Sequence, residues 1–568
     1  MKKQCNNCSK TFQITKSDQD FYDKLNFLAP TLCPDCRVQR RMAWRNDRTF
    51  YVRKCDLTGE EFVSGYPESA PFPVYKPDAW YSDDWDPLKY GRDYNYSKTF
   101  FENWYELYKE VPKLGIDIVN CENSDFCNYC GDEKNCYLDI AGEANEDCYF
   151  NLFTKYSKNC ADCTFVYKSE LTYESISCYN CHNVRYSMYV DDSFDCAFSF
   201  DLKGCSNVLF SANLRNQKYM IYNKQYSKEE YEKELKKYNF GSYKEVQKYI
   251  KQYRELLQKA IHRDTYVSKS EDCTGNNIKN SKNTKYAFNI TDCENSKFLF
   301  DVLDAKDCYD LSYSLYDPEG SLELISTLNM KFSAFSMASH YCANTFYSDQ
   351  CNNSSDLFGC IGLNKQKFCI LNKQYSEQDY QKEVNKISEQ MKQSGEWGEF
   401  FPNKYAPFAY NETVAYEYFP LFKEDCIARG FAWKDANPKD YQKQSYQIPD
   451  DIVDVSEKIT QNLLSCIDCE KNYKIVAQEL ALYKQMILPI PRKCPDCRHR
   501  ERIKQRNPRQ LWYRQCMCTQ PEHTHKGRPA DNAWRSHAGR CPIEFETTYS
   551  PERKEIIYCE TCYQKEII

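Results

Sequence analysis

The sequence predicts a multidomain, mainly β protein, in which a duplicated β-solenoid body with helical caps is flanked by small cysteine modules. Three observations lead to this prediction. A cysteine motif near the start recurs near the end at a constant offset of 461 residues. Short β-type runs separated by polar turns recur about every 10–15 residues through the middle, as in a solenoid. A strand followed by a helix start, Asn223–Ser227, recurs as Asn372–Ser376.

Two terminal modules, residues 1–55 and 461–516, each contain two Cys-x2-Cys pairs. Four thiolates with this spacing fit one tetrahedral Zn²⁺, and they leave no open position for water, so we expect structural zinc. The second pair of each module opens a predicted helix, which is the treble-clef arrangement. The predicted ligands are Cys5, Cys8, Cys33 and Cys36 in the first module and Cys466, Cys469, Cys494 and Cys497 in the second.

Both modules resemble the probable zinc-ribbon (treble-clef-like) family, whose pattern combines Cys-x2-Cys, Phe-x-Ile, Phe-Tyr, Pro, Cys-Pro-x-Cys-Arg and a basic tail. The resemblance implies a zinc-binding fold, with the same eight cysteines as ligands, and implies no activity. The layout of the whole chain is similar to that of large cysteine-rich proteins from uncultured small-genome bacteria, which also implies no activity.

Residues 517–568 hold a third cysteine set, for which we predict another zinc site with Cys518, Cys541, Cys559 and Cys562 as ligands. Cys516, His523 and His525 could each replace Cys518 as the fourth ligand. We prefer Cys518 because Cys516 has a counterpart, Cys55, in a stretch that lacks the other cysteines. That stretch, residues 56–116, is predicted to be an aromatic linker or cap that includes a metal-free copy of the C-terminal unit.

The middle of the chain is predicted to contain two solenoid halves, each closed by a helical cap, and a connector. Small Cys, Ser and Ala side chains are expected to stack inward as ladders between coils. Metal binding by Cys121, Cys127, Cys130 and Cys136, or by the pairs Cys160/Cys163 and Cys178/Cys181, is the alternative. The solenoid halves are residues 117–226 and 264–374, the caps are 227–263 and 375–402, and the connector is 403–460.

Three helix starts are predicted from side chains that can cap a helix. Ser227-x-x-Glu230 is a capping box for the helix of the first cap. Ser17 is the expected N-cap of a helix over residues 17–25, and Ser97 that of a helix over residues 97–111.

The charge is unevenly distributed, since each terminal module holds 12 Lys/Arg against 5 acidic residues while the whole chain has a net charge of −6. A basic module of this kind is expected to meet an anionic partner, and arginines can grip phosphates. The basic residues could equally form a solvated face or dock on the acidic middle of the same chain. The predicted RNA or DNA contacts are Arg37, Arg41, Arg45 and Arg48, with their counterparts Arg498, Arg502, Arg506 and Arg509.

The sequence therefore predicts a zinc-binding scaffold whose basic modules contact RNA or DNA. The alternative is a structural or protein-interaction scaffold with purely structural zinc. A β-solenoid enzyme acting on sugars, with Asp191, Asp192 and Asp195 as an acid cluster, is the weaker alternative, and we expect no enzyme. The sequence has no phosphate-binding Gly-rich loop, no visible export signal and no long apolar run, so we expect a cytoplasmic location without a membrane partner.

Overall fold

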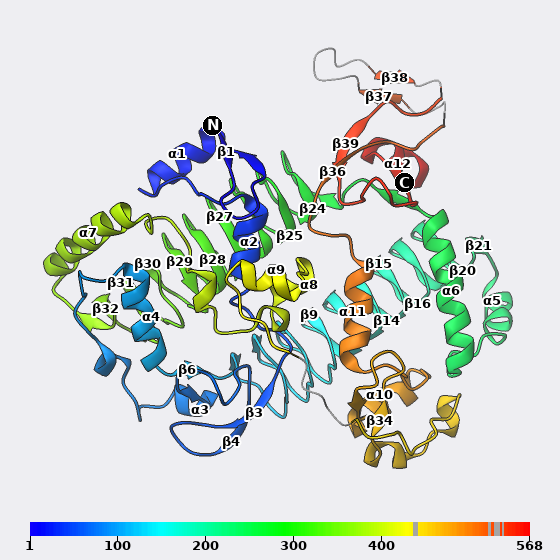
Figure 1. Cartoon of the computed structure of the whole chain (residues 1–568). Helices are drawn as coiled ribbons and strands as arrows, with labels where there is room; N and C mark the ends of the chain where they lie inside the picture. Colours follow the sequence, from blue (N-terminus) through cyan, green and yellow to red (C-terminus); the bar gives the residue numbers. More distant parts are fainter. Residues whose placement is uncertain (436–440, 521–523, 527–533, 537–538, 568) are drawn as a thin grey trace. The chain divides into compact units, whose positions relative to one another are not determined.

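The computed structural model describes the chain except for residues 436–440, 521–523, 527–533, 537–538 and 568 (Figure 1). It divides into two compact units, each assembled from two separate stretches of sequence. The first unit combines Met1–Asp117 with Tyr266–Ala436, and the second combines Ile118–Thr265 with Asn437–Ile568. Each unit therefore contains one solenoid half and one terminal zinc module.

From Leu152 to Ile221, the solenoid of the second unit consists of short parallel strands that alternate between a six-stranded and a seven-stranded sheet, and Lys224–Gln225 ends the larger sheet antiparallel. Ile118–Val119 and Cys130–Gly131 form a separate parallel pair. Thr164 pairs with Ile176, and Ile176 pairs with Met188, so every coil stacks on the previous one in the same register. The strands are β7 Ile118–Val119, β8 Cys130–Gly131, β9 Leu152–Lys155, β10 Lys158–Ala161, β11 Thr164–Tyr167, β12 Glu170–Tyr173, β13 Ile176–Tyr179, β14 His182–Arg185, β15 Met188–Asp191, β16 Phe194–Ala197, β17 Phe200–Lys203, β18 Ser206–Leu209, β19 Ala212–Arg215, β20 Lys218–Ile221 and β21 Lys224–Gln225.

The solenoid of the first unit also stacks its coils through parallel strands, but these form one 11-stranded sheet, which Lys373–Gln374 ends antiparallel. Phe288 pairs with Phe300, 12 residues further along, whereas Tyr309 pairs with Leu322, so that coil is a residue longer. The first coil, in which Val267 pairs with Ile278, is a residue shorter. The strands are β23 Val267–Ser268, β24 Gly275–Lys279, β25 Ala287–Thr291, β26 Phe300–Leu303, β27 Tyr309–Leu315, β28 Leu322–Leu328, β29 Ala334–Met337, β30 Ala343–Phe346, β31 Ser355–Phe358, β32 Lys367–Ile370 and β33 Lys373–Gln374.

The interior of each solenoid is lined by hydrogen-bonded ladders of small side chains. Ser187 Oγ donates to Arg185 O and accepts from the backbone N–H of Ser199, which lies 12 residues further along. Cysteines occupy equivalent places, and Cys163 Sγ donates to Ala161 O and Thr172 O. The cysteines of both halves lie in buried clusters with Val, Leu and Ile. The predicted inward ladders of small residues are therefore confirmed.

Each coil bends because every third residue adopts the left-handed conformation, from Asn120 to Tyr222 without interruption. The same rhythm runs from Asn277 to Leu371, with a shift of register after Tyr316. A left-handed L-residue costs roughly 1–2 kcal/mol, so the coil depends on the ladders and the stacked strands to offset that cost.

Helices close both solenoids at their last coil, as predicted. In the second unit α5 (Lys228–Leu235) contacts β20 and is followed by α6 (Tyr243–Lys259); in the first unit α7 (Glu377–Ser394) contacts β32. The predicted capping box of Ser227 with Glu230 is present. The N-caps predicted at Ser17 and Ser97 are wrong, because Thr15 and Thr99 form the capping boxes instead, with Asp18 and Glu102.

The remaining elements belong to the modules and connectors. In the first unit they are β1 Lys2–Gln4, β2 Thr11–Gln13, α1 Lys16–Lys24, α2 Pro34–Met42, β3 Tyr51–Lys54, β4 Glu61–Ser64, β5 Val74–Tyr75, α3 Pro77–Trp80, α4 Phe100–Glu110, β6 Lys113–Leu114, α8 Val414–Tyr418 and α9 Lys423–Ala428. In the second unit they are β22 Ile261–Arg263, β34 Leu464–Ser465, β35 Asn472–Tyr473, α10 Ala477–Gln485, α11 Pro495–Gln505, β36 Trp512–Gln515, β37 Thr524–Lys526, β38 Trp534–Ser536, β39 Glu544–Thr547, β40 Ile556–Tyr558 and α12 Glu560–Ile567. Among the helices that the structure describes, none combines the length and apolar character needed to cross a bilayer.

The serine ladder is open to a direct test with Ser187→Ala. The substitution leaves the buried N–H of Ser199 without its acceptor, so the free energy of unfolding of the second unit should fall by about 1–3 kcal/mol. Urea unfolding followed by circular dichroism measures the loss. Ser187→Cys keeps a donor and an acceptor and should lose less; an equal loss for both variants would contradict the ladder's role.

Candidate metal centres

The two terminal modules bring their cysteines together as the spacing predicts. Cys5 and Cys8 lie in the turn between β1 and β2, Cys33 is the N-cap of α2, and Cys36 lies in its first turn. Four sulfur atoms in each module lie within 4.8 Å of one another. The tetrads are Cys5, Cys8, Cys33 and Cys36, and Cys466, Cys469, Cys494 and Cys497.

The sulfur separations fit a tetrahedral zinc ion. Cys8 Sγ lies 3.6 Å from Cys33 Sγ, and the corresponding atoms of Cys469 and Cys494 are 3.7 Å apart. A tetrahedron with Zn–S bonds of about 2.3 Å has edges of about 3.8 Å. A hydrogen bond from Cys36 lowers the pKa of Cys33 to about 5, and the thiolate is the form that binds metal. Both tetrads therefore fit structural zinc.

A third tetrad forms in the C-terminal unit, with one ligand different from the prediction. Cys516, Cys541, Cys559 and Cys562 lie within 4.8 Å of one another, and Cys518 is not among them. Cys516 Sγ accepts from the backbone N–H of Cys559 at 3.2 Å, and a hydrogen bond from the Cys559 thiol lowers the pKa of Cys516 to about 5. Cys518 instead accepts from the backbone of Cys541 through its carbonyl oxygen. Of the two histidines predicted as alternative ligands, His523 lies outside the described residues, and the side chain of His525 is not described.

Cys55, the counterpart of Cys516 in the N-terminal copy, occupies the same ligand position. The β3–β4 hairpin pairs Arg53 with Phe62, and the β36–β39 hairpin pairs Arg514 with Phe545 in the same register. Cys55 Sγ accepts from the backbone N–H of Lys76, just as Cys516 Sγ accepts from that of Cys559. The N-terminal copy has thus kept one ligand position, and Cys55 lies there in a buried cluster with Tyr75, Ala79, Trp80 and Leu114.

The basic helix of the first module is buried against its own solenoid half. Arg37 Nη2 lies 2.9 Å from Asp310 Oδ2, and Arg41 Nη1 lies 3.2 Å from both Asp310 Oδ1 and Glu323 Oε2. All four side chains are at most 2% exposed. The Arg37 guanidinium also lies over the Phe298 ring at 5.0 Å. In Figure 1, α2 lies beside β27 and β28, and contacts confirm this placement.

The second module repeats this interface in the second unit. Arg498 Nε lies 3.1 Å from Asp162 Oδ2, Arg502 Nη1 lies 2.7 Å from Asp162 Oδ1, and Arg502 Nη1 lies 3.5 Å from Glu174 Oε1. The Arg498 guanidinium lies over the Phe150 ring at 4.7 Å. Burial raises the pKa of Glu174 to about 7, against the opposing effect of Arg502.

Arg45 and Arg506, the third of the four arginines predicted in each module, both lie over an aromatic ring of the solenoid. Arg45 lies over the Tyr313 ring at 4.2 Å, and Arg506 lies over the Phe165 ring at 4.3 Å. Arg45 also pairs with Asp47 at 2.7 Å. Of the eight arginines predicted to contact nucleic acid, five are buried and three, Arg48, Arg506 and Arg509, are half-buried. The modules thus direct four of these charges, those of Arg37, Arg41, Arg498 and Arg502, inward onto carboxylates of the solenoid.

Two of the three aspartates predicted as an acid cluster, Asp192 and Asp195, accept hydrogen bonds from asparagines one coil earlier. Asn180 Nδ2 donates to Asp192 Oδ1 at 2.8 Å, and Asn183 Nδ2 donates to Asp195 Oδ1 at 2.7 Å. Each pair joins residues 12 positions apart, so these aspartates belong to exposed polar ladders. The geometry gives no support for a sugar-acting site there.

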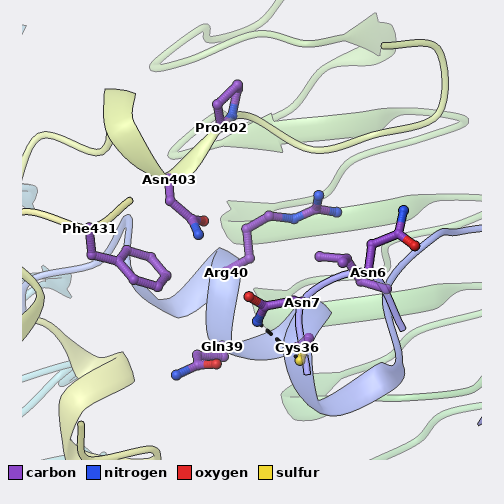
Figure 2. Close-up of a pocket in the computed structure, with 9 residues that line it drawn as sticks. Asn6, Asn7, Cys36, Gln39, Arg40, Pro402, Asn403 and Phe431 are labelled. Carbon is purple, nitrogen blue, oxygen red and sulfur yellow. Dashed lines mark hydrogen bonds between the residues drawn. The ribbon is translucent and has the colours of Figure 1, made fainter. Parts of the chain in front are cut away.

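A pocket of about 210 Å³ lies beside the first zinc module. Figure 2 shows Asn7 and residues of α2 on one side of it, and Asn403 and Phe431 on the other. Arg40 is the charged residue of its lining, and its guanidinium already pairs with Glu323 at 3.1 Å and Glu399 at 2.8 Å. The second module has Glu501 in place of Arg40, so the two units differ here.

Comparisons with known proteins bear on the first module. A family model described as a probable treble clef domain matches residues 1–44. No curated protein matches the chain. A solved structure, described as a "putative acetyltransferase" from Desulfovibrio desulfuricans G20, is 9% identical and covers 48% of this chain and 69% of its own, with a TM-score of 0.09. A score this low carries no argument, so the comparisons support the zinc module alone.

The third tetrad, with Cys516 in it and Cys518 outside it, predicts different zinc contents for two neighbouring variants. Cys516→Ser should reduce the zinc content of the full chain by one equivalent, because it removes a member of the third tetrad. Cys518→Ser should leave the content unchanged. Elemental analysis of the purified variants after removal of free zinc provides the measurement, and the opposite pattern would restore Cys518 as the ligand.

The docking interface predicts a large effect from Arg502→Ala. The substitution leaves the buried carboxylate of Asp162 short of a partner, so the free energy of unfolding of the second unit should fall by about 3–5 kcal/mol. Lys504→Ala removes the same charge from an exposed place on the same helix, α11, and should change that energy by less than about 0.5 kcal/mol.

Urea unfolding of both variants measures this difference. A similar loss for Arg502→Ala and Lys504→Ala would show that the ion pairs do not hold the module in place.

Proposed function

We propose that this protein is a structural and protein-interaction scaffold, in which zinc folds the small modules and each module locks onto its own solenoid half. The observation that supports the proposal is the repeated cluster of two arginines with one aspartate and one glutamate. The chain makes this cluster twice, from residues that lie far apart in sequence and in opposite order in the two units. The zinc-binding part of the proposal rests on the three cysteine tetrads and the treble-clef match.

The docked arginines favour the scaffold over a nucleic-acid-binding function. A phosphate group could pair with Arg41 or Arg502 only if the module left its solenoid, because both side chains are fully buried. Undocking would leave Asp162 and Asp310 exposed beside the ligand, where they would repel phosphates. Contact with RNA or DNA through the half-buried Arg48, Arg506 and Arg509 stays a prediction.

The nucleic-acid content of the full chain, purified at low salt with zinc and reductant, tests the proposal. We expect protein free of nucleic acid, and no binding of single-stranded or double-stranded probes at moderate salt. Probe binding that falls steeply with salt concentration would instead indicate phosphate contacts.

Two variants locate any binding that is observed. Arg506→Ala and Arg509→Ala remove half-buried charges, whereas Lys504→Ala removes an exposed charge of the neighbouring helix as a control. Binding that is lost in the arginine variants and kept in the lysine variant would overturn the purely structural interpretation of the basic helices.

A further inference from the structure

One coil of the second unit's solenoid has an unusual set of inward side chains. The inward positions follow one another every third residue, and here they are Glu133, Cys136, Asp139 and Gly142. The preceding coil has Cys121, Ser124, Cys127 and Cys130 in these places, and the following coil has Asn145, Cys148, Asn151 and Thr154. Two carboxylates thus lie in a core whose neighbouring coils contain uncharged side chains.

The two carboxylates and the thiol converge inside the coil. Glu133, Cys136 and Asp139 are 1%, 2% and 0% exposed, and one ligand atom from each lies within 4.8 Å of the other two. Asn145 Nδ2, in the next coil, donates to Glu133 Oε1 at 3.0 Å and to Asp139 Oδ2 at 3.1 Å. Within the described residues, Glu133 Oε2 and Asp139 Oδ1 are buried without a hydrogen-bond partner. Buried unpaired acceptors of this kind are costly, and the cost is larger for charged groups.

Gly142 provides the space that the Glu133 carboxylate occupies. A Cβ atom built on Gly142 would lie 1.9 Å from Glu133 Oε1 and 2.9 Å from Asn145 Nδ2. On the same ladder, Cys130 lies one coil before Gly142 and Thr154 lies one coil after it. Of these three positions, only the one beside the Glu133 carboxylate lacks a side chain. The residues of this coil are therefore matched to one another around a polar centre.

We propose that Glu133, Cys136 and Asp139 bind a divalent metal ion inside the solenoid, separate from the three terminal tetrads. The mixed sulfur and oxygen ligands fit Zn²⁺, which accepts Cys, Asp and Glu. A bound cation would satisfy the two unpaired carboxylate oxygens and compensate their charge in the core.

A shared proton is the competing explanation, since burial raises the pKa of both Glu133 and Asp139. A protonated pair needs no metal, and the two explanations predict different metal contents. They also predict different responses to amide variants, because Gln and Asn can hydrogen-bond one another but bind zinc poorly.

Metal analysis of the full chain decides between them. After reconstitution with zinc and removal of free metal, the unmodified chain should hold four equivalents, and the double variant Glu133→Gln/Asp139→Asn should hold three. Cys148→Ser changes the next residue on the ladder of Cys136, outside the proposed ligand set, and should keep four equivalents. Reconstitution with Co²⁺ provides a second readout, because the double variant should lose the absorption of the one mixed-ligand centre and keep that of the thiolate tetrads.

Three equivalents in the unmodified chain would overturn the proposal and leave the shared proton as the explanation. This count needs no variant, so it decides the question even if the double variant fails to fold. Four equivalents retained by a folded double variant would also overturn it, because the fourth metal would then lie elsewhere.

Discussion

A buried cluster of two arginines, an aspartate and a glutamate holds each zinc module on its solenoid, and both parts contribute to its geometry. The zinc tetrad fixes the start of the helix that carries both arginines, which are one turn apart in α2 and in α11. The coil stacking fixes the two carboxylates, since Asp162 and Glu174 lie one coil apart. A cluster of this kind adds little net stability, because four charges must leave water, but it strongly disfavours any arrangement that leaves one charge unpaired.

The two units show how a duplicated design tolerates change. The module precedes its solenoid in the first unit and follows it in the second, yet the arginines, carboxylates and aromatic rings meet in the same combination. The extra residue between Asp310 and Glu323 does not disturb the pairing of Arg41 with both. In the hairpin unit, one copy has four cysteines, whereas the other has Thr58, Lys76 and Ala79 in place of three of them. Aromatic packing is common to both copies, since Tyr75 and Trp80 are buried in one and Tyr558 and Tyr563 in the other.

Features that depend on local spacing could be predicted from the sequence, and features that depend on distant partners could not. The two terminal tetrads, the inward ladders and the Ser227 capping box follow from short patterns. The burial of Arg37 does not, because its partner Asp310 lies 273 residues away and a basic helix looks the same whether it faces water or an acidic surface. Thr15 caps α1 through a reciprocal pair with Asp18, but the expected N-cap Ser17 has Asp20 at the same spacing, so spacing alone does not distinguish the two. The counterpart of Cys516 in the N-terminal copy, Cys55, is misleading in the sequence, because it suggests that Cys516 is not a ligand. Cys55 preserves the position of Cys516 and not its function.

The left-handed residue at every third place has a consequence for how such a chain can vary over time. A branched Cβ is strongly disfavoured in that conformation, whereas Asn, Asp, aromatic and other unbranched side chains are tolerated at some cost. From Asn120 to Tyr222 and from Lys269 to Asn372, stretches that the structure describes completely, none of the left-handed positions is Val, Ile or Thr. The sequence therefore indicates this fold less through a motif than through the periodic absence of β-branched residues. Related sequences could lose every cysteine of the core and still be recognised, because Val, Ile and Thr would be absent from every third position.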